Sequence, residues 1–482
     1  MQTLGKTLNT PLYRGLSNGR LESNQSDARA TLGPGGLVQC FLMPFRVARS
    51  ARLSAQVLAL LVVAVALPTQ AGLAIQSWTA KSGTRVLFVE SRSIPMLDVA
   101  VDFDAGGRRA PAGKAGLAGL TNGMLALGST GLAESQIADK FADTGAQRGA
   151  RADQDRSAIT LRTLSSSAER EAALALLATL LQNPSFPEDA LKREKARAIA
   201  GLKEAETRPA AIADRAFSRA MYRSHPYGAS ASAESVASIS RADVVAFYQA
   251  NFSAARAVVS LIGDISRSQA EAIAEQLTAG LPAGEAPGVL PPVGVPDPTP
   301  IRIAHPATQS HILLGMPAMA RGDADFFALT VGNYILGGGG FVSRLMNEVR
   351  EKRGLAYSVY SYFAPLKQAG PFQIGLQTRK EQANEALKLV QGVVADYVAK
   401  GPTAAELKAA KDNLSGGFAL RIDNSRKILD NLAVIGFYGL PLDYLDQWVA
   451  NVERVSLADV KSALARRVKP AEFAIVVVGA PE

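Results

Sequence analysis

The alternation of hydrophobic and polar residues predicts strands and helices that recur in the same order along the chain. Apolar runs rich in β-branched residues indicate strands, and apolar residues at helical spacing among helix-forming ones indicate helices. Strands are expected at 85–90, 96–103, 158–164, 301–305, 311–316 and 372–378, and helices at 169–181 and 380–400. Helices grouped between strands favour an α+β fold with mixed or antiparallel sheets over a doubly wound parallel sheet.

The sequence also matches itself without gaps at an offset of 216 residues. Residues 240–244 fall on 456–460, and the apolar run 258–263 falls on 474–479. Leu191, Lys192 and Lys195 fall on Leu407, Lys408 and Lys411. Such self-similarity predicts two copies of one module, at 76–280 and 301–482. Seven prolines between 282 and 300 exclude a helix or a central strand there, so 281–300 is expected to be an extended linker.

One glycine-rich segment in the second module combines a loop signal with candidate binding groups. Gly337, Gly338, Gly339 and Gly340 predict a loop, because glycine is costly inside a helix. A helix is expected at 341–352, ended by Gly354, and a strand at 357–363. The residues expected on the apolar face of this helix are Phe341, Val342, Leu345, Met346 and Val349.

This segment has three interpretations. It is the glycine linker of an ordinary helix–strand unit, or a ligand loop beside which Arg350 and Tyr357 supply a guanidinium group and a phenol. A phosphate cradle is the third and weakest, because the glycine run has neither the G-K-[ST] of a P-loop nor a spaced G-x-G-x-x-G.

Composition and charge do not indicate a nucleic-acid partner. The 482 residues are 48% hydrophobic and 20% charged, which is ordinary for a globular protein of two or more domains. The net charge is +9, but residues 1–71 hold seven Lys/Arg against two Asp/Glu, so the remainder carries only +4. The basic excess is concentrated at the N-terminus and says little about partners.

Residues 43–71 have the features of a secretory signal peptide. Arg46, Arg49 and Arg52 precede an apolar stretch at 57–67, and a small-x-Ala cleavage site ends at Ala71. The stretch is shorter than the roughly twenty residues of a membrane span, although an uncleaved anchor is the alternative. Residues 1–42 are expected to be disordered or to precede the true start at Met43. The only cysteine, Cys40, precedes the cleavage site, so the exported chain has no thiol and a periplasmic location is expected.

The sequence G-G-G-G-F-V-S-R-L-M-N-E-V-R-E-K-R-G-L-A-Y-S-V at 337–359 resembles the second-half signature of the insulinase/pitrilysin family of zinc metallopeptidases, which includes mitochondrial processing peptidase. The resemblance implies two homologous α+β halves that face each other like a clamshell. It also implies that Arg350 and Tyr357 match an arginine and a tyrosine that hold the substrate peptide near the zinc in family members.

Catalytic family members carry H-x-x-E-H in the first half, with two zinc ligands, a glutamate as general base and a further glutamate ligand downstream. The residues that flank this motif are present here at 114–118 and 124–130, but its zinc ligands and its general base are absent. Gly119 and Gly123 occupy the ligand positions, Asn122 the general-base position, and Ala200 the downstream position. Neither glycine nor alanine can bind zinc, and an amide cannot take a proton from water. The chain is therefore expected to hold no metal.

The remaining polar residues suggest no replacement site. His225, His305 and His311 are expected to be structural, and the acidic residues Glu134, Asp139 and Asp143 are expected to form a solvated helix face. No Ser-His-Asp or Cys-His pattern indicates another nucleophile.

The resemblance implies a substrate-binding subunit of a periplasmic heterodimeric zinc peptidase that acts on peptides. The chain would not be catalytic alone. Its partner would be a homologous subunit that carries H-x-x-E-H and the zinc, and Gly337–Gly340 would give the peptide backbone room. No nucleic acid is expected to bind, nor a membrane after signal cleavage. Two alternatives stay open: a catalytically dead scaffolding homologue, and a stand-alone peptide-binding module.

Overall fold

The computed structural model describes residues 73–284 and 288–479. The predicted extension at 1–42, the predicted signal peptide that starts near Met43, and Cys40 lie outside these residues. Within them, no helix has both the length and the apolar character that crossing a membrane requires.

The first half of the described chain builds a six-stranded sheet in the order β1-β2-β8-β3-β7-β6, with all neighbours antiparallel except β2 and β8. A separate two-stranded sheet pairs β4 with β5. The strands are β1 (Gln76–Thr79), β2 (Arg85–Glu90), β3 (Met96–Phe103), β4 (Gly128–Ser129), β5 (Leu132–Ala133), β6 (Gln147–Ala152), β7 (Ser157–Leu164) and β8 (Ala257–Gly263). The helices are α2 (Leu117–Met124), α3 (Glu134–Thr144), α4 (Ser167–Gln182), α5 (Glu188–Ala205), α6 (Pro209–Tyr222), α7 (Ala233–Ala237), α8 (Arg241–Asn251) and α9 (Arg267–Thr278).

The second half builds a five-stranded sheet in the order β11-β12-β10-β13-β9, in which only β13 and β9 are parallel. Its strands are β9 (Ile301–Ala304), β10 (Gln309–Met319), β11 (Val359–Phe363), β12 (Gly370–Arg379) and β13 (Ala474–Gly479). Its helices are α10 (Phe326–Asn333), α11 (Ala383–Lys400), α12 (Ala404–Gly416), α13 (Ser425–Tyr438), α14 (Trp448–Arg454) and α15 (Leu457–Arg467).

The two halves repeat each other with the offset that the sequence predicts. A shift of 216 residues carries α6 onto α13 at both ends, and carries the first residues of α4, α5 and α8 onto those of α11, α12 and α15. The sheet orders also correspond, since β2-β8-β3-β7-β6 matches β9-β13-β10-β12-β11. The predicted α+β class with two homologous halves is confirmed.

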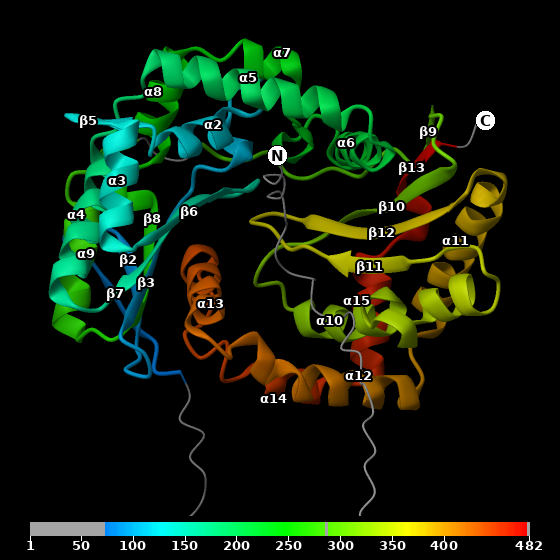
Figure 1. The fold of residues 1–482 in the computed structure, drawn as a ribbon. Coiled ribbons are helices and arrows are strands. Elements are labelled where there is room, and N and C mark those ends of the chain that lie inside the picture. The colour runs from blue at the N-terminus through cyan, green and yellow to red at the C-terminus, as the bar shows by residue number, and fades with distance from the viewer. Residues whose placement is uncertain (1–72, 285–287, 480–482) are drawn as a thin grey trace, which may run out of the picture. The chain divides into compact units, whose positions relative to one another are not determined.

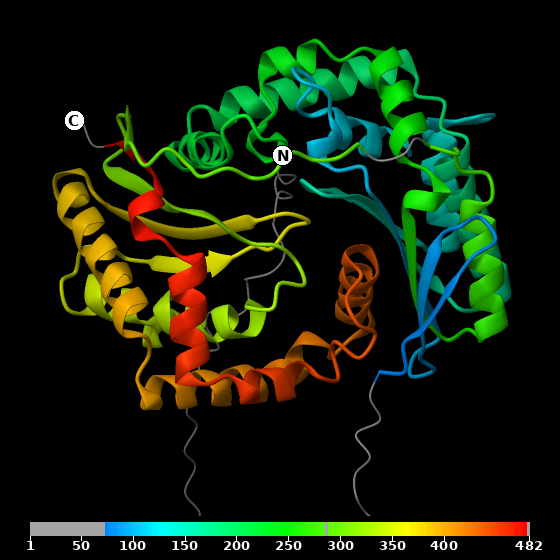
Figure 2. The ribbon, with the colours of Figure 1, turned by 180° about the vertical axis from the view of Figure 1, so that it is seen from behind.

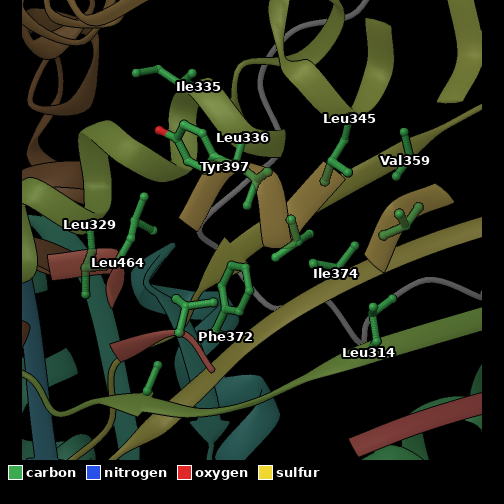
Figure 3. Packing of buried hydrophobic residues seen from close by; sticks show 14 of the residues in the cluster. Leu314, Leu329, Ile335, Leu336, Leu345, Val359, Phe372, Ile374, Tyr397 and Leu464 are labelled. Carbon is green, nitrogen blue, oxygen red and sulfur yellow. The ribbon is translucent and has the colours of Figure 1, made fainter. Parts of the chain in front are cut away.

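Each half has its own core on one face of its sheet. Alternate residues of a strand point to opposite faces, so Phe88 and Val99 join the first core while Leu87 faces the other side. In the second half, Leu314, Phe372 and Ile374 pack under Leu345 and other residues of the helical layer (Figure 3).

The opposite face of each sheet is covered by a helix from the other half (Figures 1 and 2). Helix α13 packs its Leu429 and Leu432 on Leu87 and other residues of β2, β3 and β8. Helix α6 packs on β10 and β13 of the second sheet, where its residues Phe217 and Met221 meet Leu313 and Val476. The halves are thus joined by a reciprocal exchange of equivalent helices.

Each exchanged helix ends in a tyrosine that binds a hairpin turn of the other half. The Tyr438 hydroxyl donates to Asp155 Oδ2 at 2.9 Å, in the turn between β6 and β7. The Tyr222 hydroxyl donates to the Ala369 carbonyl oxygen at 3.2 Å, in the turn between β11 and β12. Because these tyrosines are 216 residues apart, the two contacts are equivalent in the repeat.

Asp155 is the centre of a buried polar cluster that links the halves. Its carboxylate is 0% exposed. It accepts hydrogen bonds at 2.7 Å from Arg108 Nε, from the Tyr227 hydroxyl and from the backbone N–H of Lys367. With Tyr438 as a fourth donor, two residues of the first half and two of the second hold this one carboxylate.

Helix α13 approaches the first sheet most closely at Gly436, and this contact gives a stability prediction. A Cβ at this position would lie 2.5 Å from Val258 Cγ1 and 2.7 Å from Leu87 Cδ1. Val258 cannot move aside easily, because a β-branched side chain is stiff about χ1. Gly436→Ala should therefore destabilise the protein by about 1 kcal/mol, since the overpacking exceeds the gain in helix propensity.

The matched control for this prediction is Gly392→Ala in α11. Its added Cβ meets no atom within 4 Å, so only the helix propensity changes. We expect this variant to gain about 0.5–1 kcal/mol in the free energy of unfolding. Urea denaturation of both variants gives the comparison, and a stabilised Gly436→Ala would show that α13 does not lie this close to the sheet.

The predicted linker has no helix or strand in its described part. It lies against both halves, because the carbonyl oxygen of Pro291 contacts His225 Nε2 at 3.1 Å and that of Leu290 accepts from Gln368 Nε2 at 3.3 Å.

Candidate functional site

The positions of the degenerate zinc motif lie together on helix α2. Gly119 and Gly123 are exposed on one side of the helix, and a Cβ on either glycine would meet no atom within 4 Å. Asn122 is buried, and its Nδ2 donates to the carbonyl oxygens of Arg151 at 2.8 Å and Ala158 at 3.4 Å. The amide at the general-base position therefore fastens α2 to β6 and β7.

The residues of this region do not fit a zinc ion. Ala200 lies exposed on α5, a helix that packs against α2, and its side chain has no ligand atom. In the part of the chain that the structure describes, no three His, Cys, Asp or Glu residues are grouped so that they could hold a metal. The side chains at the four motif positions therefore cannot bind zinc or supply the general base.

The second candidate site brings Arg350 and Tyr357 together. The Arg350 guanidinium carbon lies 5.0 Å from the centre of the Tyr357 ring and 4.7 Å from the centre of the Phe341 ring. Both distances are within the range of cation–π attraction. The guanidinium group is thus close to two aromatic rings. We call Phe341, Arg350 and Tyr357 the aromatic–arginine cluster.

The aromatic–arginine cluster is presented to solvent. Tyr357 is 82% exposed and Phe341 67% exposed, whereas large aromatic side chains are usually buried. The N–H groups of the Arg350 guanidinium make no hydrogen bond within the described residues, and its side chain is 28% exposed, so they are able to donate to a carbonyl oxygen. The cluster can therefore combine hydrogen bonds to a peptide backbone with apolar contact.

The helix predicted at 341–352 is only partly correct. A 3₁₀ turn at Gly340–Val342 is followed by Ser343 in an extended conformation, and a π-helical stretch covers Met346–Glu351. Leu345, Met346 and Val349 are buried as expected, but Phe341 and Val342 are exposed. Sequence reasoning placed Phe341 in the core and missed it as part of the site, because helical spacing from Leu345 was the only signal. Gly354 ends the stretch as predicted, with φ +61° and its N–H bonded to the Arg350 carbonyl oxygen.

The prediction of a glycine loop at 337–340 is also partly wrong. Helix α10 continues without a break into a π-helical turn, Tyr334–Gly338, which includes Gly337 and Gly338. Asn333 and Ser361 bond each other through their side chains at 2.7 Å, which fixes this turn against β11. A Cβ on Gly337 would lie 2.6 Å from the Ser361 backbone nitrogen.

Three of these glycines are therefore explained by close packing within the chain. A Cβ on Gly338 would lie 2.6 Å from Asn333 Nδ2, and one on Gly339 2.7 Å from the Tyr334 carbonyl oxygen. Gly340 differs, because it has φ +62° and open space around it. Only Gly340 leaves room beside the chain for a ligand.

An ion pair anchors the segment between Gly340 and the aromatic–arginine cluster. Arg344 donates to both carboxylate oxygens of Glu406 at 2.7 Å, and its guanidinium lies over the Tyr397 ring. Glu406 also accepts from the Thr403 backbone N–H in the capping box of α12. The hydrogen bonds from Arg344 are the main cause that lowers the pKa of Glu406 to about 2 from an ordinary 4.5.

This ion pair gives a pH-dependent prediction. Because the pKa of Glu406 is lower in the folded state, its stabilising effect is complete above pH 4.5 and is lost as the pH falls toward 2. The pair is partly exposed, so we expect Glu406→Gln to cost no more than about 1 kcal/mol at neutral pH. Denaturant unfolding of both proteins at pH 7 and near pH 3 measures the difference, which should shrink at the lower pH. A difference independent of pH would contradict this assignment.

The other sequence candidates lie apart from these two regions. His225 is buried and contacts Gln368 Oε1 at 3.1 Å, and His305 accepts from the Ala307 backbone N–H. His311 is in β10, and its pKa is lowered mainly by burial. The acidic residues predicted on a solvated helix face are exposed on α3, as expected.

Comparison with known proteins supports this description. Residues 85–234 match the family model "Insulinase (Peptidase family M16)", and residues 238–414 match "Peptidase M16 inactive domain". A crystal structure of a peptidase M16 inactive domain from Pseudomonas fluorescens is 39% identical, covers 85% of this chain and 99% of its own, and has a TM-score of 0.81.

Two curated relatives extend over most of the chain. The uncharacterized zinc protease YmxG of Bacillus subtilis is 25% identical over 84% of this chain and 98% of its own. The non-peptidase homolog YmxG of Helicobacter pylori is 26% identical over 78% of this chain and 87% of its own. The relatives thus include chains described as peptidases and a chain described as a non-peptidase.

Proposed function

Because the chain belongs to the insulinase family (peptidase family M16) as a homologue without its zinc ligands, we propose that it is the substrate-binding subunit of a two-chain zinc peptidase. The observation that carries the proposal is an asymmetry between the halves. The ligand positions on α2 are glycines on which a Cβ would meet no atom within 4 Å, whereas in the second half a partly exposed Arg350 lies beside an exposed Tyr357. A purely structural chain has no need of an arginine beside two exposed aromatic rings.

The substrate in this proposal is a peptide held in an extended conformation. Arg350 donates to a peptide carbonyl oxygen, and Tyr357 donates its hydroxyl to a neighbouring one. Phe341 keeps the guanidinium in place and offers an apolar surface to a substrate side chain. A carbonyl held by such donors is polarised where charge develops during hydrolysis. The chain supplies this binding, and the zinc belongs to a homologous partner with H-x-x-E-H.

The proposed location is the periplasm. It is supported by the signal-peptide features at 43–71 and by a described chain without cysteine. In this location the complex acts on peptides that have been exported or imported into the periplasm.

The test is a reconstitution. The full chain and a homologue from the same organism that carries H-x-x-E-H are purified, and peptide hydrolysis is measured for each alone and for the mixture. We expect no turnover by this chain alone and chelator-sensitive turnover by the mixture. Turnover by the isolated chain would show that another site does chemistry. A complex without turnover would favour the scaffolding alternative.

A further inference from the structure

A recess lies at the junction of α10 with the segment that leads into α14. It is separate from the degenerate zinc motif on α2 and from the aromatic–arginine cluster. It has a volume of about 350 Å³. Its walls include the aromatic residues Phe326, Phe327 and Tyr444, together with Arg321 and Gln447. We call it the α10–α14 pocket, since these two helices pack against each other (Figure 1).

One wall of the α10–α14 pocket is a continuous aromatic surface. The rings of Phe326 and Phe327 are 5.2 Å apart edge to face, and Tyr444 lies 6.4 Å from the first and 6.2 Å from the second. Trp448 supports Phe327 from below at 6.2 Å. Phe326, Phe327 and Tyr444 are only partly buried, so their free faces can receive an apolar group.

The other wall holds an arginine that lacks an anionic partner. Within the described residues, the Arg321 side chain has no hydrogen bond or ion pair, and its Nε is buried and unsatisfied. It makes a cation–π contact, with the guanidinium carbon 5.3 Å from the Tyr438 ring centre. Burial is the main cause that lowers the pKa of Arg321, which indicates that its charge is poorly hydrated. A partly desolvated cation without an acceptor is costly, and a bound anion would relieve that cost.

The carboxylates around the pocket do not meet this need. Asp323 is paired with Arg467 at 2.8 Å, and Asp443 lies exposed at the rim. The charge of Asp155 raises the pKa of Arg321, but Asp155 forms no ion pair with it and accepts from the four donors described above. A planar guanidinium is best matched by a carboxylate, which can accept two parallel hydrogen bonds.

We propose that the α10–α14 pocket binds a carboxylate whose neighbouring group is apolar or aromatic, as at the C-terminus of a peptide that ends in phenylalanine or leucine. Arg321 receives the carboxylate, the aromatic wall receives the side chain, and the Gln447 amide lies where it can bond the preceding peptide group. This binding needs no zinc and no partner chain, so its test is independent of the test of the function proposed above.

The experiment titrates the full chain with N-acetyl-L-phenylalanine and with its amide, by calorimetry or ligand-detected NMR. The acid and the amide share the ring and differ in the carboxylate. We expect saturable binding of one acid per chain, with the amide at least about tenfold weaker, because a hydrogen bond to a charged group is lost. Acetate tests for a carboxylate alone and should bind far more weakly. An octapeptide that ends in phenylalanine tests for a peptide C-terminus and should bind at least as tightly as the acid.

Two variants locate the site. Arg321→Gln should weaken binding of the acid at least about tenfold, whereas Arg426→Gln, which removes an exposed charge on α13, should leave it unchanged. If Arg321→Gln does not fold, Arg321→Lys keeps a cation but loses the planar fork and should bind more weakly than the wild type. Equal binding of acid and amide, full affinity in both Arg321 variants, or no binding at millimolar concentrations would each overturn the proposal.

Discussion

Replacing Asp155 by alanine should lower the free energy of unfolding by about 3–5 kcal/mol, the range for removing one partner of a buried ion pair. The substitution leaves the Arg108 guanidinium, whose side chain is 1% exposed, with only Asp104 as a carboxylate partner. It also leaves the hydroxyls of Tyr227 and Tyr438 without their acceptor. Each orphaned polar group adds its own desolvation cost.

The control for Asp155 is an acidic residue at the same junction that is not buried. Asp430 on α13 pairs with Arg151 at 2.8 Å, but its side chain is 49% exposed. Asp430→Ala should therefore cost less than about 1 kcal/mol. Guanidinium denaturation measures both variants. A cost of Asp155→Ala no larger than that of Asp430→Ala would show that the buried cluster does not hold the halves together.

Arg350→Ala and Tyr357→Phe should each lower turnover by the reconstituted complex about 10²–10³-fold, as is typical when one donor to a reacting carbonyl is removed. The Tyr357 side chain is on the surface and that of Arg350 is 28% exposed, and neither forms a side-chain hydrogen bond within the described chain. Arg350 lies 3.7 Å from Glu351, and Tyr357 is 82% exposed. The folded chain and its assembly with the partner should therefore be unaffected. Size-exclusion chromatography of the mixture together with peptide hydrolysis separates these effects.

Arg353→Ala is the matched control for this second prediction. Arg353 lies three residues from Arg350 in the same segment, but it bonds Glu348 and does not contact the aromatic–arginine cluster. Its removal should leave turnover within about twofold of the wild type, as expected for a surface ion pair. Full activity in both Arg350→Ala and Tyr357→Phe would refute the assignment of the peptide clamp.

The fold class could be predicted from sequence because strands and helices depend on local periodicity, and the repeat could be predicted because the two halves keep matching residues 216 positions apart. Strand alternation at 96–103 and helical spacing at 169–181 are set by neighbouring residues and survive in the structure. The exchange of α6 and α13 could not be predicted. Amphipathic spacing shows that Phe217 and Leu432 must be buried, but it does not show which of two similar sheets receives them.

The sequence predicts the absence of the zinc ligands but not the geometry around the glycine run, for a similar reason. Missing side chains at Gly119 and Gly123 can be recognised from sequence alone, since no fold can supply ligand atoms to a glycine. The π-helical turn at Gly337 could not, because it depends on Asn333 meeting Ser361 from a later strand. Phe341 was misplaced because an apolar residue at helical spacing is usually buried, and its contact with Arg350 appears only in three dimensions.

The exchanged helices also set the order in which the chain can acquire its final structure during synthesis or export. The first sheet is complete once β8 has emerged, yet its face with Leu87 and Val258 is covered mainly by α13 and the residues next to it in the second half. At five to twenty residues per second, the delay is on the order of ten seconds. During that time a bare apolar sheet persists, which a chaperone or a premature intermolecular contact could occupy. A premature stop before Ser425 would make this state permanent, so such truncated chains should aggregate rather than accumulate as a folded half.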